Sequence, residues 1–263
     1  MQGERAAIDD GKVYLVGAGL GVPDLLTVRA VKVLARAEIV FHDALIHQDI
    51  LAYCPPECTC VPVGTRGGMP ARHRQEHIHT LLAEAVKRYK TVVRLKGGDP
   101  CVFGRGGEEI AFLSANGIPW EVVPGISAGL GGLSLLGLPV THRDLASSVT
   151  LLTGSRVGSG DFEGLPLAPA LSASQTLVFY MCFRHIADIA QQLMQHGLAP
   201  ETYALCASWI SYPQQKLVAA PLVQIGAAVA EMQLEAPAIM VVGDVVRFWQ
   251  GLYNGVADGS AYA

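Results

Sequence analysis

A run of chemically capable side chains occupies residues 94 to 109, with the sequence RLKGGDPCVFGRGGEE. It combines several glycines, an aspartate held in front of a proline, two arginines and a pair of carboxylates. Gly97 and Gly98 lack a Cβ, so the backbone there can turn sharply and approach a ligand closely. Glu108 and Glu109 stand where a helix is expected to begin, which suits acids because of the helix dipole. The GGDP segment alone is typical of an ordinary turn, and RGGEE alone is typical of an ordinary helix start. Together the two segments indicate a binding loop.

A buried strand must position this run. Thr91 to Leu95 read TVVRL, and β-branched residues of this kind are typical of a strand that enters a sheet. Residues Gly106 to Asn116 are then expected to form a helix. Ligands of open α/β sheets bind beyond the carboxyl ends of the strands. The order of strand, glycine loop and helix therefore predicts an α/β fold with the binding loop at a strand end.

A second glycine loop follows the first expected strand, Lys12 to Val16. The loop reads GAGLGVPD over residues 17 to 24, and a helix is expected from about residue 25 to residue 37. The dinucleotide fingerprint GxGxxG requires its third glycine where this chain has Val22. This mismatch argues against an enzyme that uses a nicotinamide dinucleotide.

Asp43 follows the next expected strand, Glu38 to His42. In a dinucleotide fold an acid at this place would bind ribose. An aspartate here can also cap the helical turn expected from Ala44 to Ala52. The residues alone do not separate a structural Asp43 from a functional one.

The α/β pattern extends over the whole chain. Residues 137 to 147, GLPVTHRDLAS, have the composition of a linker, so we expect two α/β domains, residues 1–140 and 141–263. Some strands of the second domain are expected to be antiparallel. Strands are expected at 58–63, 118–123, 148–153, 175–180, 202–206, 216–220 and 238–242, and helices at 75–89, from 126 onward, at 184–196 and at 222–233.

Composition limits the classes of partner. The chain of 263 residues is 51% hydrophobic and 16% charged, which favours a compact protein with a large core. A net charge of −4 gives no general attraction for nucleic acid or an anionic membrane, so local arginines would have to hold an anionic substrate. The first ten residues, MQGERAAIDD, lack the apolar core of a signal peptide, and we expect a reducing, cytoplasmic setting.

Two groups of residues resemble metal ligands only in part. Cys54, Cys58 and Cys60 are close in sequence, but they form no CxxC pair and bring no fourth ligand of suitable spacing. His73 and His77 could share one helical turn, yet no Cys or carboxylate completes a set. The sequence therefore predicts no metal site.

The motif KGGDPxxFGRGGEE closely resembles the signature of the uroporphyrinogen-III C-methyltransferases, members of the tetrapyrrole methylase superfamily. The loop VGAGxGxPxLLT, the run FHDALI and the tetrapeptide THRD resemble further family motifs, and the resemblance covers Val13 to about Trp249. It implies two α/β domains with the active-site cleft between them. It also implies a homodimer.

The same resemblance implies a reaction. S-adenosyl-L-methionine would methylate uroporphyrinogen III at ring carbons 2 and 7, giving precorrin-2 through precorrin-1 and releasing S-adenosyl-L-homocysteine. A sibling precorrin methyltransferase is the nearest alternative. A catalytically weak tetrapyrrole-binding or nucleotide-binding protein is another, because Thr65 and Leu20 replace the Lys and Pro that are usual in the family.

The resemblance also assigns residues. Asp43 would accept the proton that leaves the macrocycle, and Arg105, Glu108 and Arg143 would face the substrate, with Arg105 also counted as catalytic. The donor would contact residues of both domains: Leu20, Gly97, Gly98, Asp99, Val102, Ser127, Ala128, Met181, Ile210 and Ala238.

Overall fold

The computed structural model describes residues 11–44, 46–64, 71–154 and 174–253. The chain divides into two compact units, Met1–Ser127 and Ala128–Ala263. The division lies ahead of the boundary expected near residue 140, because the small-residue helix after Ser127 packs within the second unit. There the backbone N–H of Gly129 donates to the Tyr180 hydroxyl at 2.8 Å.

The first unit is built on a five-stranded sheet in the order β3-β2-β4-β1-β5, and all its pairings are parallel. The strand that precedes the central motif lies in the middle of this sheet, between β1 and β2, as the sequence predicted for a buried strand. The strands are β1 (Lys12–Gly17), β2 (Ile39–His42), β3 (Thr59–Pro62), β4 (Thr91–Lys96) and β5 (Trp120–Val123).

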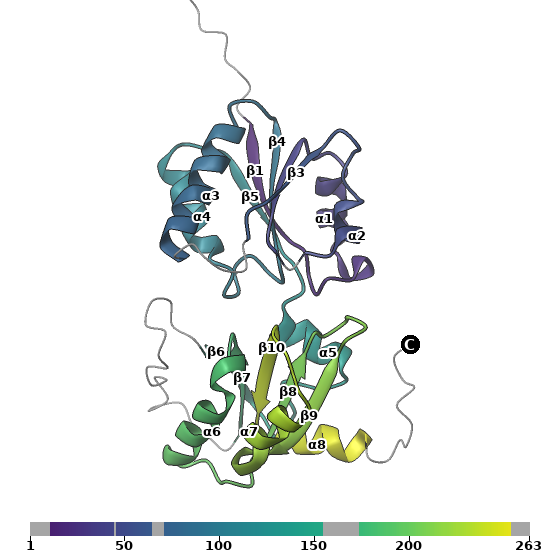
Figure 1. Cartoon of the computed structure of the whole chain (residues 1–263), viewed down its shortest axis with the longest axis vertical. Helices are drawn as coiled ribbons and strands as arrows, with labels where there is room; N and C mark the ends of the chain where they lie inside the picture. Colours follow the sequence, from purple (N-terminus) through teal and green to yellow (C-terminus); the bar gives the residue numbers. More distant parts are fainter. Residues whose placement is uncertain (1–10, 45, 65–70, 155–173, 254–263) are drawn as a thin grey trace, which may run out of the picture. The chain divides into compact units, whose positions relative to one another are not determined.

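Helices cover both faces of this sheet (Figure 1). The short 3-10 turn η1 (Pro23–Leu25) precedes α1 (Val28–Leu34), which lies with α2 (Gln48–Leu51) on one face; α3 (Ala71–Ala85) and α4 (Gly106–Ala115) lie on the other. Successive strand residues point to opposite faces. Val93 and Leu95 accordingly join the core beneath α1, whereas Val92 joins the core beneath α3 and α4.

The chain reverses its direction across the sheet between β1 and β4. The loop after β1 leads to α1 on one face, and the loop after β4 leads to α4 on the other face. Such a switch point leaves a crevice beyond the carboxyl ends of two neighbouring strands, which is the usual ligand site of open α/β sheets. Both glycine loops singled out from the sequence therefore border the same crevice.

The second unit has a mixed sheet in the order β6-β7-β10-β8-β9. β6 and β7 are parallel, and the other pairings are antiparallel, as expected. A π-helical turn (Ala128–Gly132) and α5 (Leu133–Leu135) begin the unit, and a 3-10 turn (Phe183–His185) precedes α6. The strands are β6 (Ser148–Thr153), β7 (Gln175–Tyr180), β8 (Tyr203–Ser208), β9 (Lys216–Pro221) and β10 (Ala238–Val242).

Helices α6 (Ile186–Gln195) and α7 (Leu222–Glu231) share a core cluster with β7, β8 and β10. The sequence did not predict the last helix, α8 (Asp244–Tyr253), although Val245, Val246 and Trp249 are buried at helical spacing. Its Trp249 indole N–H donates to the Leu136 carbonyl at 2.7 Å. No helix in the described part of the chain is long and apolar enough to cross a membrane.

Candidate active site

A buried charged cluster lies at the carboxyl end of β4. Arg94 and Lys96 alternate with Val93 and Leu95 and therefore point toward α4, where Glu109 is fully buried. Arg94 Nε and Lys96 Nζ both donate to Glu109 Oε1, at 3.2 Å and 3.0 Å. The Gln75 amide from α3 donates to the same oxygen at 3.1 Å. These contacts fix the start of α4 against the end of β4.

The cluster contains two cations, Arg94 and Lys96, for one fully buried carboxylate. Burial lowers the pKa of the Lys96 ammonium below its ordinary value, and the neighbouring Arg94 guanidinium lowers it further. Glu109 Oε2, by contrast, is buried and has no hydrogen-bond partner among the described residues. The cluster is therefore not fully hydrogen-bonded: all its contacts to Glu109 are made through Oε1.

Asp43 joins this cluster from β2. Arg94 reaches across to pair with Asp43 Oδ1, and the backbone N–H of Gly97 lies 3.4 Å from Asp43 Oδ2. The interpretation of Asp43 as a helix cap is wrong, because α2 begins later and its cap is His47. Asp43 is instead a carboxylate, one-third exposed, at the end of β2 beside the glycine loop.

Glycines let three loops meet at the strand ends. A Cβ on Gly17 would lie 2.6 Å from the backbone of Gly125, and one on Gly125 would lie 2.2 Å from the Gly98 carbonyl oxygen. Gly19 and Gly98 exchange two backbone hydrogen bonds, at 3.2 Å and 2.9 Å. Larger residues at these close approaches would force the loops after β1, β4 and β5 apart.

Two of the donor-loop glycines border open space instead. A Cβ added to Gly97 or Gly98 would meet no atom of the described residues within 4 Å, and Gly98 has a left-handed φ of +67°. Packing within the described part of the chain therefore does not explain the absence of a side chain at Gly97. The open space would let a bound ligand, such as the methyl donor, come close to the backbone at these glycines.

The remaining residues of the first unit that were predicted to contact the methyl donor either fix the glycine loop or are at least partly buried. Asp99 accepts from the backbone N–H groups of Cys101 at 2.8 Å and Gly125 at 3.0 Å, so its carboxylate ties two loops together. Leu20 and Ser127 are buried, and Val102 is partly buried. The Asp99 carboxylate is therefore engaged with the protein's own backbone.

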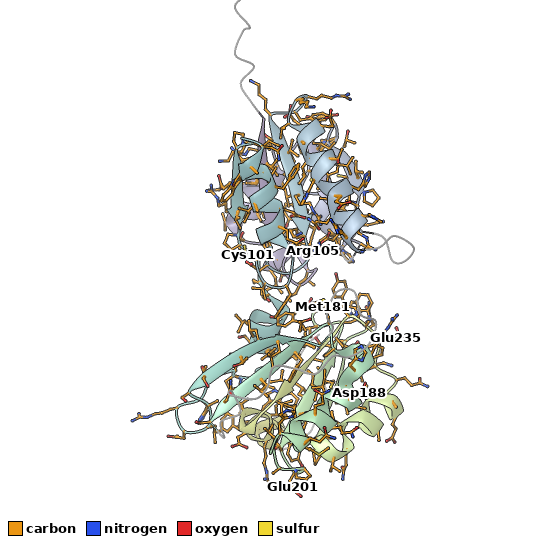
Figure 2. All side chains as sticks on the ribbon, turned by 90° about the vertical axis from the view of Figure 1, so that its left-hand side faces the viewer. Cys101, Arg105, Met181, Asp188, Glu201 and Glu235 are labelled. Carbon is orange, nitrogen blue, oxygen red and sulfur yellow. The ribbon has the colours of Figure 1, made fainter. Side chains whose placement is uncertain are left out.

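Arg105 and Glu108 form a two-bond pair at the start of α4. Arg105 Nε donates to Glu108 Oε1 at 2.8 Å, and its NH2 group donates to Oε2 at 2.6 Å. This hydrogen bonding lowers the pKa of Glu108 and raises that of Arg105. Arg105 has a left-handed φ of 58°, and Figure 2 labels it among the loops of the first unit. The two predicted substrate residues therefore hold one another in a fixed orientation.

The second unit gathers three donor candidates at one end of its sheet. Met181 follows the carboxyl end of β7 and is 52% exposed (Figure 2). Ala238 begins the antiparallel neighbour β10 and pairs with Ser208 at the end of β8, and Ile210 follows Ser208. Ala128 is the first residue of the unit.

Arg143 lies elsewhere in the second unit. It is exposed in the turn closed by the His142 to Ala146 bridge, and this turn precedes β6. The His142 ring lies 4.7 Å from the Phe248 ring of α8. Since β6 and β7 are parallel, β6 begins at the sheet end opposite to Met181. The structure does not bring Arg143 together with the donor candidates of its unit.

Sequence reasoning missed the central cluster. It named Glu108 as a substrate residue, but it named none of Arg94, Lys96 and Glu109 as functional. One signal was available: two cations at alternate positions of an otherwise apolar strand must share a face and require a buried anion. Thr65, whose departure from the family pattern was noted, lies outside the described residues.

Comparison with known proteins gives a consistent family. The family model for tetrapyrrole (corrin/porphyrin) methylases matches residues 12–226. A uroporphyrinogen-III C-methyltransferase from a Sinorhizobium species is 40% identical over 258 residues, which cover 98% of this chain and 92% of the relative. The siroheme synthase of Azotobacter vinelandii is 44% identical over 237 residues, 90% of this chain but 50% of that protein. The chain thus spans about half the length of such relatives.

Solved structures agree with these matches. The crystal structure of a uroporphyrin III C-methyl transferase from Thermus thermophilus superposes with a TM-score of 0.77 at 38% identity, covering 90% of this chain and 100% of that one. The Thermus thermophilus transferase complexed with S-adenyl homocysteine gives a TM-score of 0.76 at the same identity and covers 90% of this chain.

Proposed function

The chain belongs to the tetrapyrrole methylase family, and from this membership we propose that it is a C-methyltransferase acting on uroporphyrinogen III. It would methylate ring carbons 2 and 7 and form precorrin-2 through precorrin-1. The observation that carries the proposal is the open space at Gly97 and Gly98, beside the switch point of the first sheet. The similarity to the Sinorhizobium and Thermus transferases supports the choice of substrate.

We propose that the donor is S-adenosyl-L-methionine, which supplies an electrophilic methyl group and leaves as S-adenosyl-L-homocysteine. In the first unit the backbone at Gly97 and Gly98 would bind it, and Leu20, Val102 and Ser127 would exclude water. Asp99 would act by fixing the loop. Residues of the second unit would complete the donor's contacts: Ala128, Met181, Ile210 and Ala238.

The substrate carries acetate and propionate groups, and the protein's net negative charge gives no general attraction for them. Arg105 would bind a carboxylate, because a guanidinium offers a planar two-bond fork. Glu108 would hold that guanidinium in position. Arg143 would also contact the substrate, from the turn that precedes β6.

Methylation of a ring carbon requires the later loss of a proton, so one modest base is needed. Asp43 would accept this proton at a carboxylate oxygen. Arg94 and the Gly97 N–H would orient the carboxylate toward the crevice. The buried Glu109, by holding Arg94, would position Asp43 indirectly.

Two finer features belong to the same proposal. We propose that the protein works in the cytoplasm and as a homodimer, as the family resemblance implies. It would need neither a metal ion nor a nicotinamide cofactor for the transfer. The branch that consumes the product depends on other enzymes.

Product analysis tests the proposal. The purified protein is incubated anaerobically with uroporphyrinogen III and the donor, and the products are weighed by mass spectrometry. We expect a mass gain of two methyl groups. Methylation of a later precorrin but not of uroporphyrinogen III would show that the protein is a sibling precorrin methyltransferase instead. Donor binding without any transfer would identify a catalytically weak binding protein.

A further inference from the structure

Three cysteines of the first unit converge on one point. The sulfur atoms of Cys54, Cys58 and Cys60 all lie within 4.8 Å of one another. Cys54 follows α2, Cys58 closes a turn by donating its N–H to the Pro55 carbonyl at 2.9 Å, and Cys60 lies in the edge strand β3. The sequence predicted no metal site here, because the usual CxxC spacing is absent.

Local geometry explains why the unusual spacing still gathers the sulfurs. Cys58 and Cys60 are two residues apart along an extended chain, so their side chains point to the same face. The turn that begins at Pro55 brings Cys54 back toward that face. The CxC pair and the turn together replace the CxxC arrangement.

The surroundings of the sulfurs suit a site that is closed on one side and open on the other. Cys54 and Cys58 are partly buried against the core beneath α1, and Cys60 is exposed. A cation shared by the three sulfur atoms would replace their thiol protons.

We propose that Cys54, Cys58 and Cys60 form a binding site for one soft, thiophilic cation of low coordination number, with copper(I) as the type. Three sulfurs about 2.3 Å from one ion lie about 4 Å apart, which is compatible with sulfur atoms that all lie within 4.8 Å of one another. Structural zinc is almost always bound by four ligands, and the described residues provide three. Soft thiolate ligands select copper(I).

Binding displaces the thiol protons to solvent, and the sulfur electron pairs form the bonds to the ion without any change of oxidation state. The site lies at the amino end of β3, since Cys58 directly precedes Thr59, where that strand begins, and Cys60 is its second residue. The donor loops follow the carboxyl ends of β1 and β4. Occupation of the cysteine site should therefore leave donor binding unchanged.

The test uses the full-length, reduced protein under anaerobic conditions. Copper(I) is titrated in competition with a coloured copper(I) chelator, and X-ray absorption counts the sulfur neighbours of the bound ion. We expect one ion per chain with three sulfur neighbours. In the Cys60→Ser variant we expect affinity to fall by more than about 100-fold, since even the outer-shell partners of metal ligands contribute up to about that factor.

Cys101→Ser is the matched control, because Cys101 is also exposed but lies apart from the cluster. It should bind copper(I) as the unchanged protein does. Circular dichroism checks that both variants fold, and Cys60→Ser should bind S-adenosyl-L-homocysteine as the unchanged protein does. Binding that persists in Cys60→Ser, equal losses in both variants, or preference for zinc(II) when both ions are offered would overturn the proposal.

Discussion

Arg94 and Glu109 form an ion pair inside the first unit, where the Arg94 side chain is 3% exposed and the Glu109 side chain is fully buried. The pair joins the end of β4 to the first turn of α4 and so spans the whole central motif. A buried pair of this kind adds little net stability, but breaking it leaves an uncompensated charge. Its role is to hold Asp43 and the glycine loop in one arrangement.

Replacing the buried glutamate should destabilise the protein strongly. Glu109→Gln leaves Arg94 and Lys96 without their carboxylate, so we expect the free energy of unfolding to fall by about 3 to 5 kcal/mol. Denaturant unfolding measures the change. Glu108→Gln is the matched control, because that exposed pair contributes at most about 1 kcal/mol. Equal effects of the two variants would show that the buried cluster does not fix the fold.

Lys96 should make stability depend on pH. Because burial lowers its pKa in the folded protein, the folded state releases the Lys96 proton at a lower pH than the unfolded state does. The unfolded state then binds more protons, so stability rises as pH increases toward the ordinary lysine value of 10.5. The free energy of unfolding of the unchanged protein should rise over this range relative to Lys96→Met. Parallel pH profiles of the two proteins would contradict the shift.

Gly97 should be required for binding rather than for folding. A Cβ there meets no atom of the residues that the structure describes within 4 Å, so Gly97→Ala should change the free energy of unfolding by less than about 1 kcal/mol. Its affinity for S-adenosyl-L-homocysteine, measured by calorimetry, should fall at least tenfold, or about 1.4 kcal/mol. Gly107→Ala also adds a methyl group in open space and should bind normally. Normal binding by Gly97→Ala would place the donor elsewhere.

Arg105 should serve the substrate and not the donor. Arg105→Ala should cost about 2 to 5 kcal/mol of substrate or transition-state binding, if the carboxylate it binds is largely desolvated. Arg105→Lys should recover only part of this, because an ammonium lacks the planar fork. Methyl transfer and donor binding are measured for both variants. If donor binding weakened as much as turnover, Arg105 would shape the donor loop instead.

The sequence was most informative where one local pattern determines the structure. Apolar runs such as TVVRL predicted the strands, and the glycine loops predicted which strand ends carry the site. The Arg94 to Glu109 pair was not predicted, because it depends on how α4 packs against β4. The three cysteines were rejected on spacing, since the turn that returns Cys54 cannot be read from a ligand motif. Arg143 was chosen by motif alone, and the place of its turn depends on tertiary packing, since the neighbouring His142 ring contacts Phe248 of α8.

The most direct test of the central claim follows the methyl groups themselves. The protein is incubated anaerobically with uroporphyrinogen III and a donor whose transferable methyl group is enriched in carbon-13, and the product is examined by carbon-13 NMR. The account predicts two enriched methyl signals, attached to ring carbons 2 and 7. Enrichment at any other ring position, or an unlabelled macrocycle recovered from protein that binds the donor, would contradict it.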